Sequence, residues 1–589
     1  MMLRLLRIEH FRGIESVTWK IDRHLIGLIG AGDSTKTTLL DAIGLVLSPT
    51  NYLQFTDADF FSLNLTRDIV IEAVVTDLPD NLVKESQLGK DRSGILPDGT
   101  LVHDPIDQAE ECLVIRLTVN PELDPVWEVI RPASDDARPI SASQRRQLGF
   151  FRLGERPDSH LRWGRGSALM GMTDGGDGLT SIILDAHREA RQAVFNNASN
   201  VMHHAATRVQ ASAGSLGTPQ FKKLRPGLEP WSATSGHALV LHDGEVPLTR
   251  MGLGTRRLTS LSIQDQAMTQ GSIIAIDEIE HGLEPHRLAQ VLYYLKNRTD
   301  EGKLQVILTT HSPVAVKTLS AADFVVVGSD GAGTTTCRHV PEDLNNVQGT
   351  FRSAPDALLG RRVLVGEGAT EVGFLRELIR HWDEVQHHNG HATAAAIGTV
   401  LVDGGGGVQS TGRAMSFHQL GYPTHLLVDN DDDAINPYLG ELRDQGIQVH
   451  QWSADHDLER EVITTLRLDG LQELLELAVE FRGEESVCAA VGAKLGHQSL
   501  SGIDISQWLA QTNDDESKLR DAIAAAAVVK GKEWFKRQDR GEDLAAVTVK
   551  HWAGLDDTHL MRVLNELQNF VYDRPSELKA DNERHSIGD

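Results

Sequence analysis

The order of apolar and polar positions along the chain predicts strands that alternate with helices. Residues 17–22 (VTWKID) alternate as in a half-buried strand, and residues 24–30 (HLIGLIG) form the uninterrupted apolar run of a buried strand. Residues 39–47 (LLDAIGLVL) follow with a helical pattern. Further apolar strands are expected at the starts of segments 272–286 and 303–313. The first half of the chain is therefore predicted to be an α/β domain.

The same alternation resumes after a change of composition. Residues 328–346 are rich in glycine and polar residues, as expected at a boundary between domains. Short apolar strands then follow at 362–366 and 425–429, and the chain beyond residue 465 is mostly helical by pattern. A second α/β domain with a helical C-terminal region is therefore predicted.

Length and composition narrow the class of protein. A chain of 589 residues is too long for one core, so two to four domains are expected. No signal-peptide pattern and no run of 18 apolar residues occur, so we expect a cytoplasmic protein with no membrane partner. Three scattered cysteines exclude a disulfide framework and a CxxC zinc site: Cys112, Cys337 and Cys488. The formal charge of -26 disfavours nucleic acid in general, but carboxylates that hold divalent cations and local basic residues are compatible with DNA.

A glycine-bearing loop joins the strand at 24–30 to the helix at 39–47. Such a loop presents backbone N–H groups and a helix N-terminus to phosphate, while Lys36 can reach the β- and γ-phosphates and Thr37 can hold Mg²⁺. Thr35 stands where the usual pattern has glycine, and its β-branched side chain restricts the backbone. We therefore expect ATP to act as a gate more than as a source of work. The candidate nucleotide-binding residues are Gly30, Gly32, Asp33, Ser34, Thr35, Lys36, Thr37 and Thr38.

Three later segments complete the pattern of an ATPase. The strand at 272–276 ends in Asp277 and Glu278, an arrangement that puts one carboxylate on Mg²⁺ and the next near the attacking water. A second strand leads to His311, which is suited to sensing the γ-phosphate. Gly252 and Gly254 precede a helix that carries two arginines, Arg256 and Arg257.

Four elements in this order resemble the ABC-type ATPase head of the RecF, SMC and Rad50 group. The resemblance implies ATP as cofactor and a head-to-head dimer, in which the glycine segment of one subunit closes on the nucleotide of its partner. It also makes Arg12, in the segment HFRGI, a candidate nucleotide contact. Residues 80–245 lack the heptads of a long coiled coil. A helical insert at 155–230 is expected instead, either as a dimerisation element or as a surface excursion, and the basic, aromatic stretch 144–166 is read as a solvated loop in preference to a DNA contact.

Acidic residues follow two strands of the second domain. Glu367 ends the strand at 362–366, and Glu371 lies in the first turn of the next helix. Asp429 and Asp431 follow the strand at 425–429 and lie on one face by period-2 alternation. Because strands of open α/β sheets present their sites at their carboxyl ends, the four carboxylates are expected on one rim. Like charges so close together need cations, and hard oxygen ligands point to Mg²⁺ or Mn²⁺.

The glutamate strand followed by the DxD strand resembles the Toprim domain. Together with the preceding head, it resembles the layout of the OLD family of nucleases, to which the nuclease subunit of the Gabija phage-defence system also belongs. The glycine-rich segment 400–410 resembles the middle strand and turn of the OLD version, where Asp403 is an extra acidic residue of unassigned role. The family pattern also has a later acidic residue, for which Asp457, Glu459 and Glu461 are candidates, with Glu461 taken as the metal ligand. A lysine near the C-terminus completes the pattern, with Lys530 the first candidate and Lys532 the second.

The resemblance implies four segments. Residues 1–154 and 231–345 form the ATPase head, residues 155–230 the insert, and residues 356–589 the Toprim domain with its helical C-terminal region. The function implied is an ATP-regulated, Mg²⁺- or Mn²⁺-dependent DNA endonuclease or nickase that acts in defence against phage or in DNA repair. Scattered cysteines and six tyrosines without an evident site disfavour primase and topoisomerase chemistry. Two alternatives stay open: a RecF/RecR-like DNA-binding clamp without cleavage, and an ATPase whose helicase-like partner is the effector.

Overall fold

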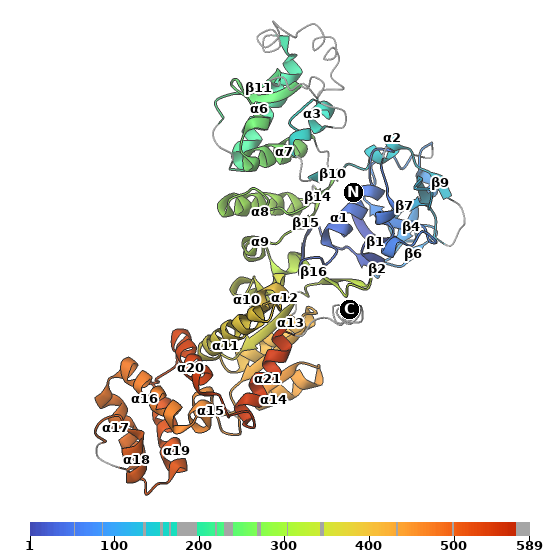
Figure 1. Cartoon of the computed structure of the whole chain (residues 1–589). Coiled ribbons are helices and arrows are strands. Elements are labelled where there is room, and N and C mark those ends of the chain that lie inside the picture. Colours follow the sequence, from blue (N-terminus) through green and yellow to red (C-terminus); the bar gives the residue numbers. More distant parts are fainter. Residues whose placement is uncertain are drawn as a thin grey trace, which may run out of the picture. The chain divides into compact units, whose positions relative to one another are not determined.

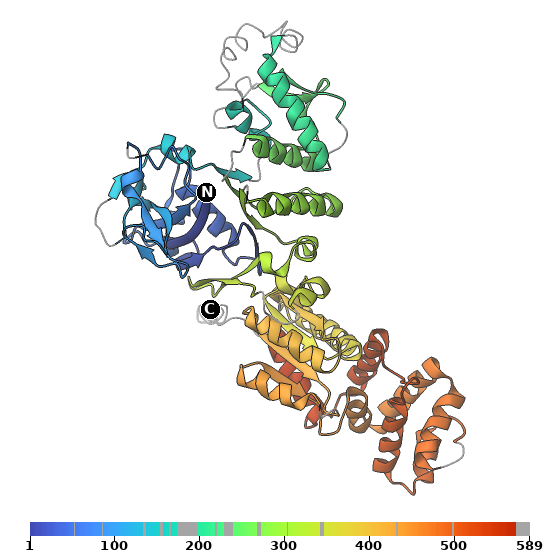
Figure 2. The same ribbon diagram turned by 180° about the vertical axis from the view of Figure 1, so that it is seen from behind.

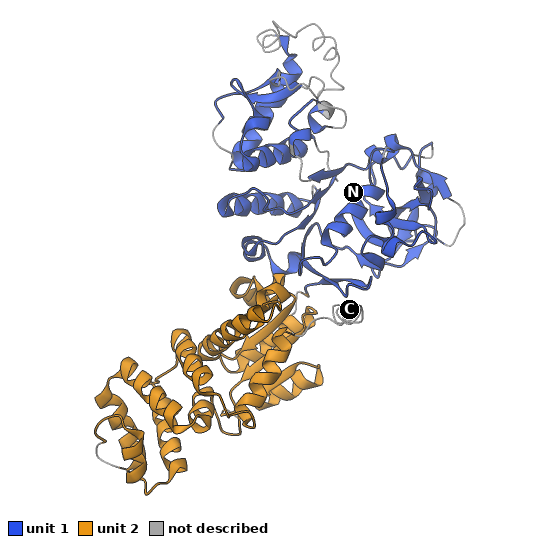
Figure 3. Ribbon diagram, in the orientation of Figure 1, with its two compact units in different colours: residues 1–340 blue, residues 341–589 orange. Residues whose placement is uncertain are grey.

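The chain divides into two compact units, residues 1–340 and residues 341–589 (Figures 1 and 3). The computed structural model describes residues 1–572, with gaps at residues 52, 85, 133–136, 154–156, 164–166, 173–196, 218–220, 229–238, 268–271, 303, 342–346, 432–433 and 497–499. Among the described residues, no helix combines the length and the apolar character needed to cross a membrane.

A six-stranded sheet forms the centre of the first unit. Five of its strands are parallel, and β17 pairs antiparallel with β16 at one edge. The central strands are buried on both faces, which explains why their sequences are apolar throughout. In spatial order the strands are β10 (Phe150–Leu153), β14 (Ser272–Ile276), β15 (Leu304–Thr309), β3 (Leu25–Ile29), β16 (Phe324–Ser329) and β17 (Thr335–His339).

A second, antiparallel sheet of eight strands lies beyond helix α1 (Lys36–Val46). This helix contacts β14 and β15 on one side and β4 and β7 on the other, while α8 (Pro285–Asp300) covers the opposite face of the parallel sheet (Figure 1). The antiparallel sheet consists of β1 (Met2–Phe11), β2 (Ile14–Lys20), β4 (Ile69–Thr76), β5 (Ser93–Ile95), β6 (Leu101–Val102), β7 (Glu110–Val119), β8 (Pro125–Ile130) and β9 (Ala137–Pro139). One face of this sheet therefore belongs to the core around α1.

The region of the predicted helical insert contains both helix and strand. Helix α6 (Asn200–Ser215) packs on β11 (Leu224–Leu228), which pairs with β12 (Leu239–Asp243). It also contacts α7 (Leu253–Ala267), the helix that follows the glycine segment. Residues 173–196 of the predicted insert lie outside the described residues.

Two arginines of the basic stretch 144–166 have structural partners. The guanidinium of Arg145 is fully buried, stacks on Trp127 and donates to the carbonyl oxygens of Ser48 and Ile140, each at 2.7 Å. Arg152 pairs with Asp41 of α1. Both arginines therefore interact with other parts of the first unit.

The second unit is built on a four-stranded parallel sheet in the order β19-β18-β20-β21. Its strands are β18 (Arg362–Gly366), β19 (Thr399–Asp403), β20 (Thr424–Val428) and β21 (Gln448–Gln451). The chain runs outward from β18 to β19 and then crosses back to β20, so the connections diverge between β18 and β20. Ligands of such sheets bind where the connections diverge, at the carboxyl ends of the strands.

Helices cover both faces of this sheet. Helices α13 (Val408–Gln419) and α14 (Asn436–Asp444) lie on the near side in Figure 2, whereas α21 (His559–Tyr572) lies on the near side in Figure 1. Helix α11 (Ala369–His388) shares a buried cluster with α21 and crosses α20 (Gln538–His551) closely enough that a Cβ on Gly373 would lie 2.0 Å from the Gln538 carbonyl oxygen. The remaining C-terminal helices are α15 (Leu458–Thr465), α16 (Leu468–Arg482), α17 (Glu484–Leu495), α18 (Ile505–Gln511) and α19 (Glu516–Ala527). The predicted mixed α/β fold with a helical C-terminal region is confirmed.

A pair of partly buried imidazoles links the sheet of the second unit to α21. His450 Nε2 lies 3.0 Å from His425 Nδ1, and His450 Nδ1 lies 3.1 Å from a carboxylate oxygen of Glu566. The His425 ring stacks on Phe570 with a centroid distance of 3.6 Å. Burial, followed by the charges of His450 and Arg362, lowers the pKa of His425 from 6.5 to about 3. Burial also lowers the pKa of His450.

We expect this pair to make the second unit less stable in mild acid. The unfolded chain binds a proton at His425 near pH 6.5 but the folded chain does not, so the stability is fully present above pH 6.5 and is lost as the pH falls toward 3. Because the ring is partly exposed, we expect a loss of about 1 kcal/mol between pH 7 and pH 5. His425→Gln lacks this titration. Its thermal midpoint should fall less than that of the wild type between these pH values, and equal falls would contradict the assignment.

Candidate nucleotide and carboxylate sites

The phosphate loop of the first unit runs from Gly30 to the start of α1. Gly30 has a φ of 134°, and an added Cβ would lie 2.3 Å from the Val327 carbonyl oxygen, so only glycine fits. Thr35 has a φ of 65°, in the left-handed region that costs a β-branched residue roughly 1–2 kcal/mol. Its hydroxyl lies 3.1 Å from that of Thr335 in β17, and its methyl group lies against Gly13. The sequence expectation of a restricted backbone at Thr35 thus has a local structural basis.

Lys36 is folded back into this loop. Its ammonium donates to the carbonyl oxygens of Gly30 (3.1 Å) and Ala31 (2.6 Å) and to the Ser34 hydroxyl (2.9 Å). Burial lowers the pKa of Lys36 to about 8, opposed by the charges of Asp33 and Asp277. A phosphate entering the loop would give this buried ammonium an anionic partner.

The carboxyl ends of β14 and β15 lie beside the loop. Asp277 accepts from the hydroxyls of Thr309 (2.6 Å) and Thr37 (3.4 Å). Glu278 is exposed, has a φ of 44° and lies 3.5 Å from His281. His311 is close enough to feel several charges: burial and Lys36 lower its pKa, while Glu280, Glu278 and Asp277 raise it. The loop, Asp277, Glu278 and His311 are therefore together in one place, as the order of motifs predicts.

The glycine segment is tied to the loop after β14 of the same chain. A Cβ on Gly254 would lie 2.5 Å from the Gly282 carbonyl oxygen, whereas Gly252 has open space around it. Arg257 donates to the carbonyl oxygens of Asp277 and His281, and Arg256 pairs with Asp158 at 2.7 Å. Arg12, a candidate nucleotide contact, instead pairs with Asp41 and Asp59.

In the second unit, Glu367 connects the ends of three strands. One carboxylate oxygen accepts from the backbone N–H of Asp429 after β20 (2.9 Å), and the other accepts from that of Gly407 after β19 (3.0 Å). The segment of four glycines makes this possible, because Gly405, Gly406 and Gly407 all have positive φ. Asp403 stabilises the same turn by accepting from the N–H of Gly405 at 2.8 Å.

The other predicted carboxylates gather around Glu367. Glu371 is buried and accepts from the N–H of Gly368 at 2.8 Å, and burial together with the Glu367 charge raises its pKa to about 7. Asp429 accepts from the N–H of Leu458 at the start of α15 (3.0 Å). Burial and then the charges of Glu371 and Glu367 raise the pKa of Asp429. Asp431 is exposed, and its charge acts on Asp457.

Two further carboxylates, Asp457 and Glu459, act on Glu371 and Asp429. Asp457 caps α15 by accepting from the N–H of Arg460 (2.7 Å), and its pKa is raised by burial and by Asp431. Glu459, one of the three candidates for the later acidic residue, is buried, and burial with the charges of Asp457 and Glu371 raises its pKa to about 8. The position of α15 against the strand ends brings them in, and nothing in the local sequence signals that packing.

The candidate Glu461 is buried, whereas the two candidate lysines lie on the surface. Glu461 is buried away from these carboxylates, where it accepts from the Ser453 N–H (3.1 Å) and lies 2.7 Å from His456 Nδ1. Lys530 and Lys532 are exposed, and so is Lys536. Burial and the charges of Asp457 and Glu371 raise the pKa of Glu459, and the charge of Lys536 opposes this rise.

The donor set agrees with Mg²⁺ or Mn²⁺ in its chemistry. Within the described residues, no three histidine, cysteine, aspartate or glutamate side chains are arranged as a finished metal-binding group. Glu367, Glu371 and Asp429 instead turn oxygens toward backbone N–H groups. Burial, and then the repulsion among these carboxylates, raise the pKa of Glu371 and Asp429. A divalent cation would relieve this repulsion through hard oxygen ligands.

Part of the first unit is similar to a known family of ATPase domains. Residues 25–317 match the family described as AAA domain, putative AbiEii toxin, Type IV TA system, so this segment is similar to an ATPase domain. The Old nuclease of Escherichia phage P2 is 25% identical over 205 residues, which cover 31% of this chain and 33% of that protein. The predicted resemblance to the OLD family is confirmed by these matches. The chain aligns with only about a third of the length of this curated relative.

Solved structures of SMC heads are also similar. The SMC head domain from Thermotoga maritima is 12% identical, with 58% of this chain and 100% of that chain covered and a TM-score of 0.30. The Smc head domain with an extended coiled coil, bound to the C-terminal domain of ScpA derived from Pyrococcus furiosus, is 14% identical, with 57% and 96% covered and a TM-score of 0.33.

Proposed function

We propose that the protein is an ATP-regulated DNA endonuclease or nickase that depends on Mg²⁺ or Mn²⁺. The observation that carries the proposal is the set of carboxylates gathered at the point where the connections of the second sheet diverge. Glu367 follows β18 and Asp429 follows β20, and both are half-buried, whereas Glu371 on α11 and Glu459 on α15 are buried. Burial, and then the charges of neighbouring carboxylates, raise the pKa of Glu371, Asp429 and Glu459. A purely structural core has no use for such repulsion. The likeness to the Old nuclease supports DNA as the substrate.

The carboxylates at this rim would have different roles in phosphodiester cleavage. Divalent ions bound there would supply an activated water and charge stabilisation for the oxygens of the phosphodiester. Glu367, Asp429 and Asp431 would hold the ions, with Glu371 and Asp457 beside them. Glu367 also fixes the rim, because it holds the backbone of β20 and the glycine turn at once.

Lys536 would stabilise negative charge on the phosphate during cleavage. Lys536 and Lys530 are both exposed. The charge of Lys536 acts on Glu459, which favours Lys536 for this role. We expect Lys536→Gln to lower the cleavage rate about 10–100-fold with little change in DNA affinity, because one positioned charge contributes a few kcal/mol to such a transition state. Cleavage by Lys530→Gln is the matched control. A large loss in that control with none in Lys536→Gln would restore the assignment made from sequence.

Nucleotide would regulate this activity from the first unit. Lys36, Thr37 and Asp277 would bind Mg²⁺–ATP, Glu278 would orient water, and His311 would contact the γ-phosphate. The strained Thr35 favours slow turnover, which suits a gate. A homodimer in which Gly252 and Gly254 meet the partner's nucleotide, a helicase-like partner and a role in defence against phage belong to the same proposal by likeness to the OLD family.

The direct test is cleavage of supercoiled plasmid by the wild-type chain. Nicked or linear product should form with Mg²⁺ or Mn²⁺ and should disappear with EDTA. Cutting that persists in EDTA would exclude the metal-dependent mechanism. Absence of cutting with either ion, with and without ATP, would favour the alternative of a DNA-binding clamp. That alternative draws support from the carboxylates turned toward backbone N–H groups within the described residues.

A further inference from the structure

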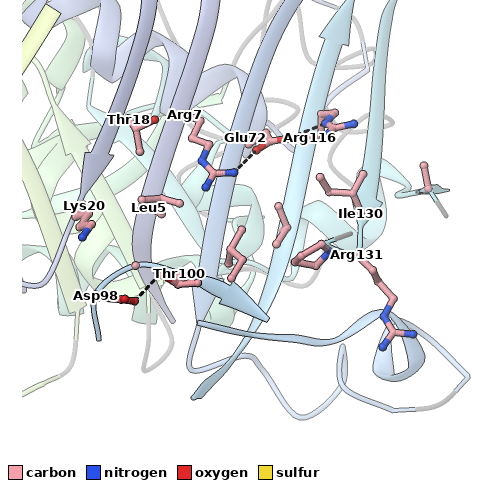
Figure 4. Close-up of a pocket in the computed structure, with 15 residues that line it drawn as sticks. Leu5, Arg7, Thr18, Lys20, Glu72, Asp98, Thr100, Arg116, Ile130 and Arg131 are labelled. Carbon is pink, nitrogen blue, oxygen red and sulfur yellow. Dashed lines mark hydrogen bonds and ion pairs between the residues drawn. The ribbon is translucent and has the colours of Figure 1, made fainter. Parts of the chain in front are cut away.

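The outer face of the antiparallel sheet carries a large pocket that the proposed function does not use. Its volume is about 820 Å³, and the opposite face of the sheet belongs to the core. Figure 4 shows the side chains of Arg7, Glu72 and Arg116 side by side across neighbouring strands. The pocket is lined from strands β1, β2, β4, β7, β8 and β9 and from the turn at residues 98–101.

Strand register builds this surface from two adjacent rows. The first row aligns Thr18, Arg7, Glu72, Arg116 and Glu128 across β2, β1, β4, β7 and β8. Two residues further along each strand, the second row aligns Lys20, Leu5, Val74, Val114 and Ile130. Because alternate residues share a face, a charged row lies beside an apolar row. The pocket therefore has an apolar floor and a row of guanidinium groups.

The charged side chains that line this pocket are mostly basic. Glu72 is buried and accepts from Arg116 Nε (2.9 Å) and Nη2 (2.6 Å), and Arg7 Nη1 lies 3.5 Å from its other oxygen. One carboxylate thus holds two arginines, whose side chains remain 42% and 37% exposed. Lys20 and Arg131 add two cations to the lining, and Asp98, whose carboxylate accepts from the N–H of Thr100, is the second anion. The lining holds four cations and two carboxylates, in a chain whose net charge is -26. Two further carboxylates lie at its edge: Asp104, which pairs with Arg131, and Glu128, which is aligned with Arg116.

We propose that this pocket binds the phosphate backbone of duplex DNA without reading its sequence. Arginines whose planes are held by a shared carboxylate can each offer a pair of N–H donors to phosphate. None of the fifteen described lining residues is aromatic, so the surface offers no platform on which a nucleotide base or single-stranded DNA could stack. The proposal rests on the proposed function, because it names where the DNA substrate of the same protein is held.

The test is fluorescence anisotropy with a labelled 30-base-pair duplex, in EDTA so that cleavage plays no part. The variant is Arg7→Gln/Lys20→Gln, which leaves both Arg116 bonds to Glu72 intact. Its matched control is Lys317→Gln/Arg352→Gln, which removes two exposed charges elsewhere. At about 0.1 M salt we expect the variant to bind at least fivefold more weakly than the control. Because each phosphate contact contributes about 0.9 to the slope of log affinity against log salt, the slope should fall by about 1–2.

Three outcomes would overturn the proposal. In the first, the variant and the control have equal affinity for duplex and equal salt slopes. In the second, the variant loses affinity for single-stranded DNA of the same length but not for duplex. In the third, the variant loses affinity only for a mononucleotide. Plasmid cleavage with Mg²⁺ is measured separately on the same proteins. A wild type that binds duplex through this pocket but never cuts would refute the nuclease and leave the binding site standing. If the wild type cuts plasmid but the variant and the control bind duplex equally well, the nuclease proposal stands and the proposed binding site is refuted.

Discussion

Glu367→Gln should reduce DNA cleavage by at least about a thousandfold. The substitution removes a negative charge from the site where two cations are expected, and it also turns one acceptor oxygen into an amide donor. Glu367 receives the N–H groups of Asp429 and Gly407 at 2.9 and 3.0 Å, so an amide can satisfy only one of them. Losses of this size are typical when a group acts as one unit with its neighbours in a catalytic centre. The measurement is the initial rate of plasmid nicking at saturating Mg²⁺.

Glu384→Gln is the matched control for this substitution. Glu384 lies on α11, the helix that follows Glu367, and its side chain is 56% exposed. It should cut like the wild type. Both variants should keep the wild-type affinity for ATP, since neither lies in the ATPase unit. Cleavage by Glu367→Gln within a few-fold of the control would remove Glu367 from the site, whatever the other carboxylates do.

The positions of site residues that directly follow a single strand could be predicted from the sequence. Glu367 and Asp429 each follow an apolar strand, and parallel strands deliver their carboxyl ends to one rim. The phosphate loop, Asp277 and His311 were predictable for the same reason. In each case a local pattern and one general rule of sheet topology determine the position.

Residues whose place depends on packing between distant elements were not predictable. Asp457, Glu459 and Glu461 lie within five positions of one another, yet only the first two act on the carboxylates of the rim. Residues two apart on a helix point in different directions, so which one faces the strands depends on how α15 is rotated against them. Glu461 instead faces Ser453 and His456. The charge of Lys536, in the loop between α19 and α20, acts on Glu459, a proximity that no local pattern encodes.

Lys36→Met should weaken the binding of Mg²⁺–ATP by about 100-fold or more while leaving the thermal midpoint within a few degrees of the wild type. Its ammonium already sits in the phosphate loop, 2.6 Å from the Ala31 carbonyl oxygen, and burial has lowered its pKa to about 8. The loop therefore holds a poorly solvated charge. Its removal loses three hydrogen bonds but also removes the free-energy cost of burying the charge, so the stability of the fold should change little. Bound phosphate would lose two charge-assisted hydrogen bonds, each contributing about 1.5–3 kcal/mol. Anisotropy of a fluorescent ATP analogue, with Lys317→Met as the exposed control, measures the loss; equal affinities in these two variants would show that the loop does not bind the nucleotide through Lys36.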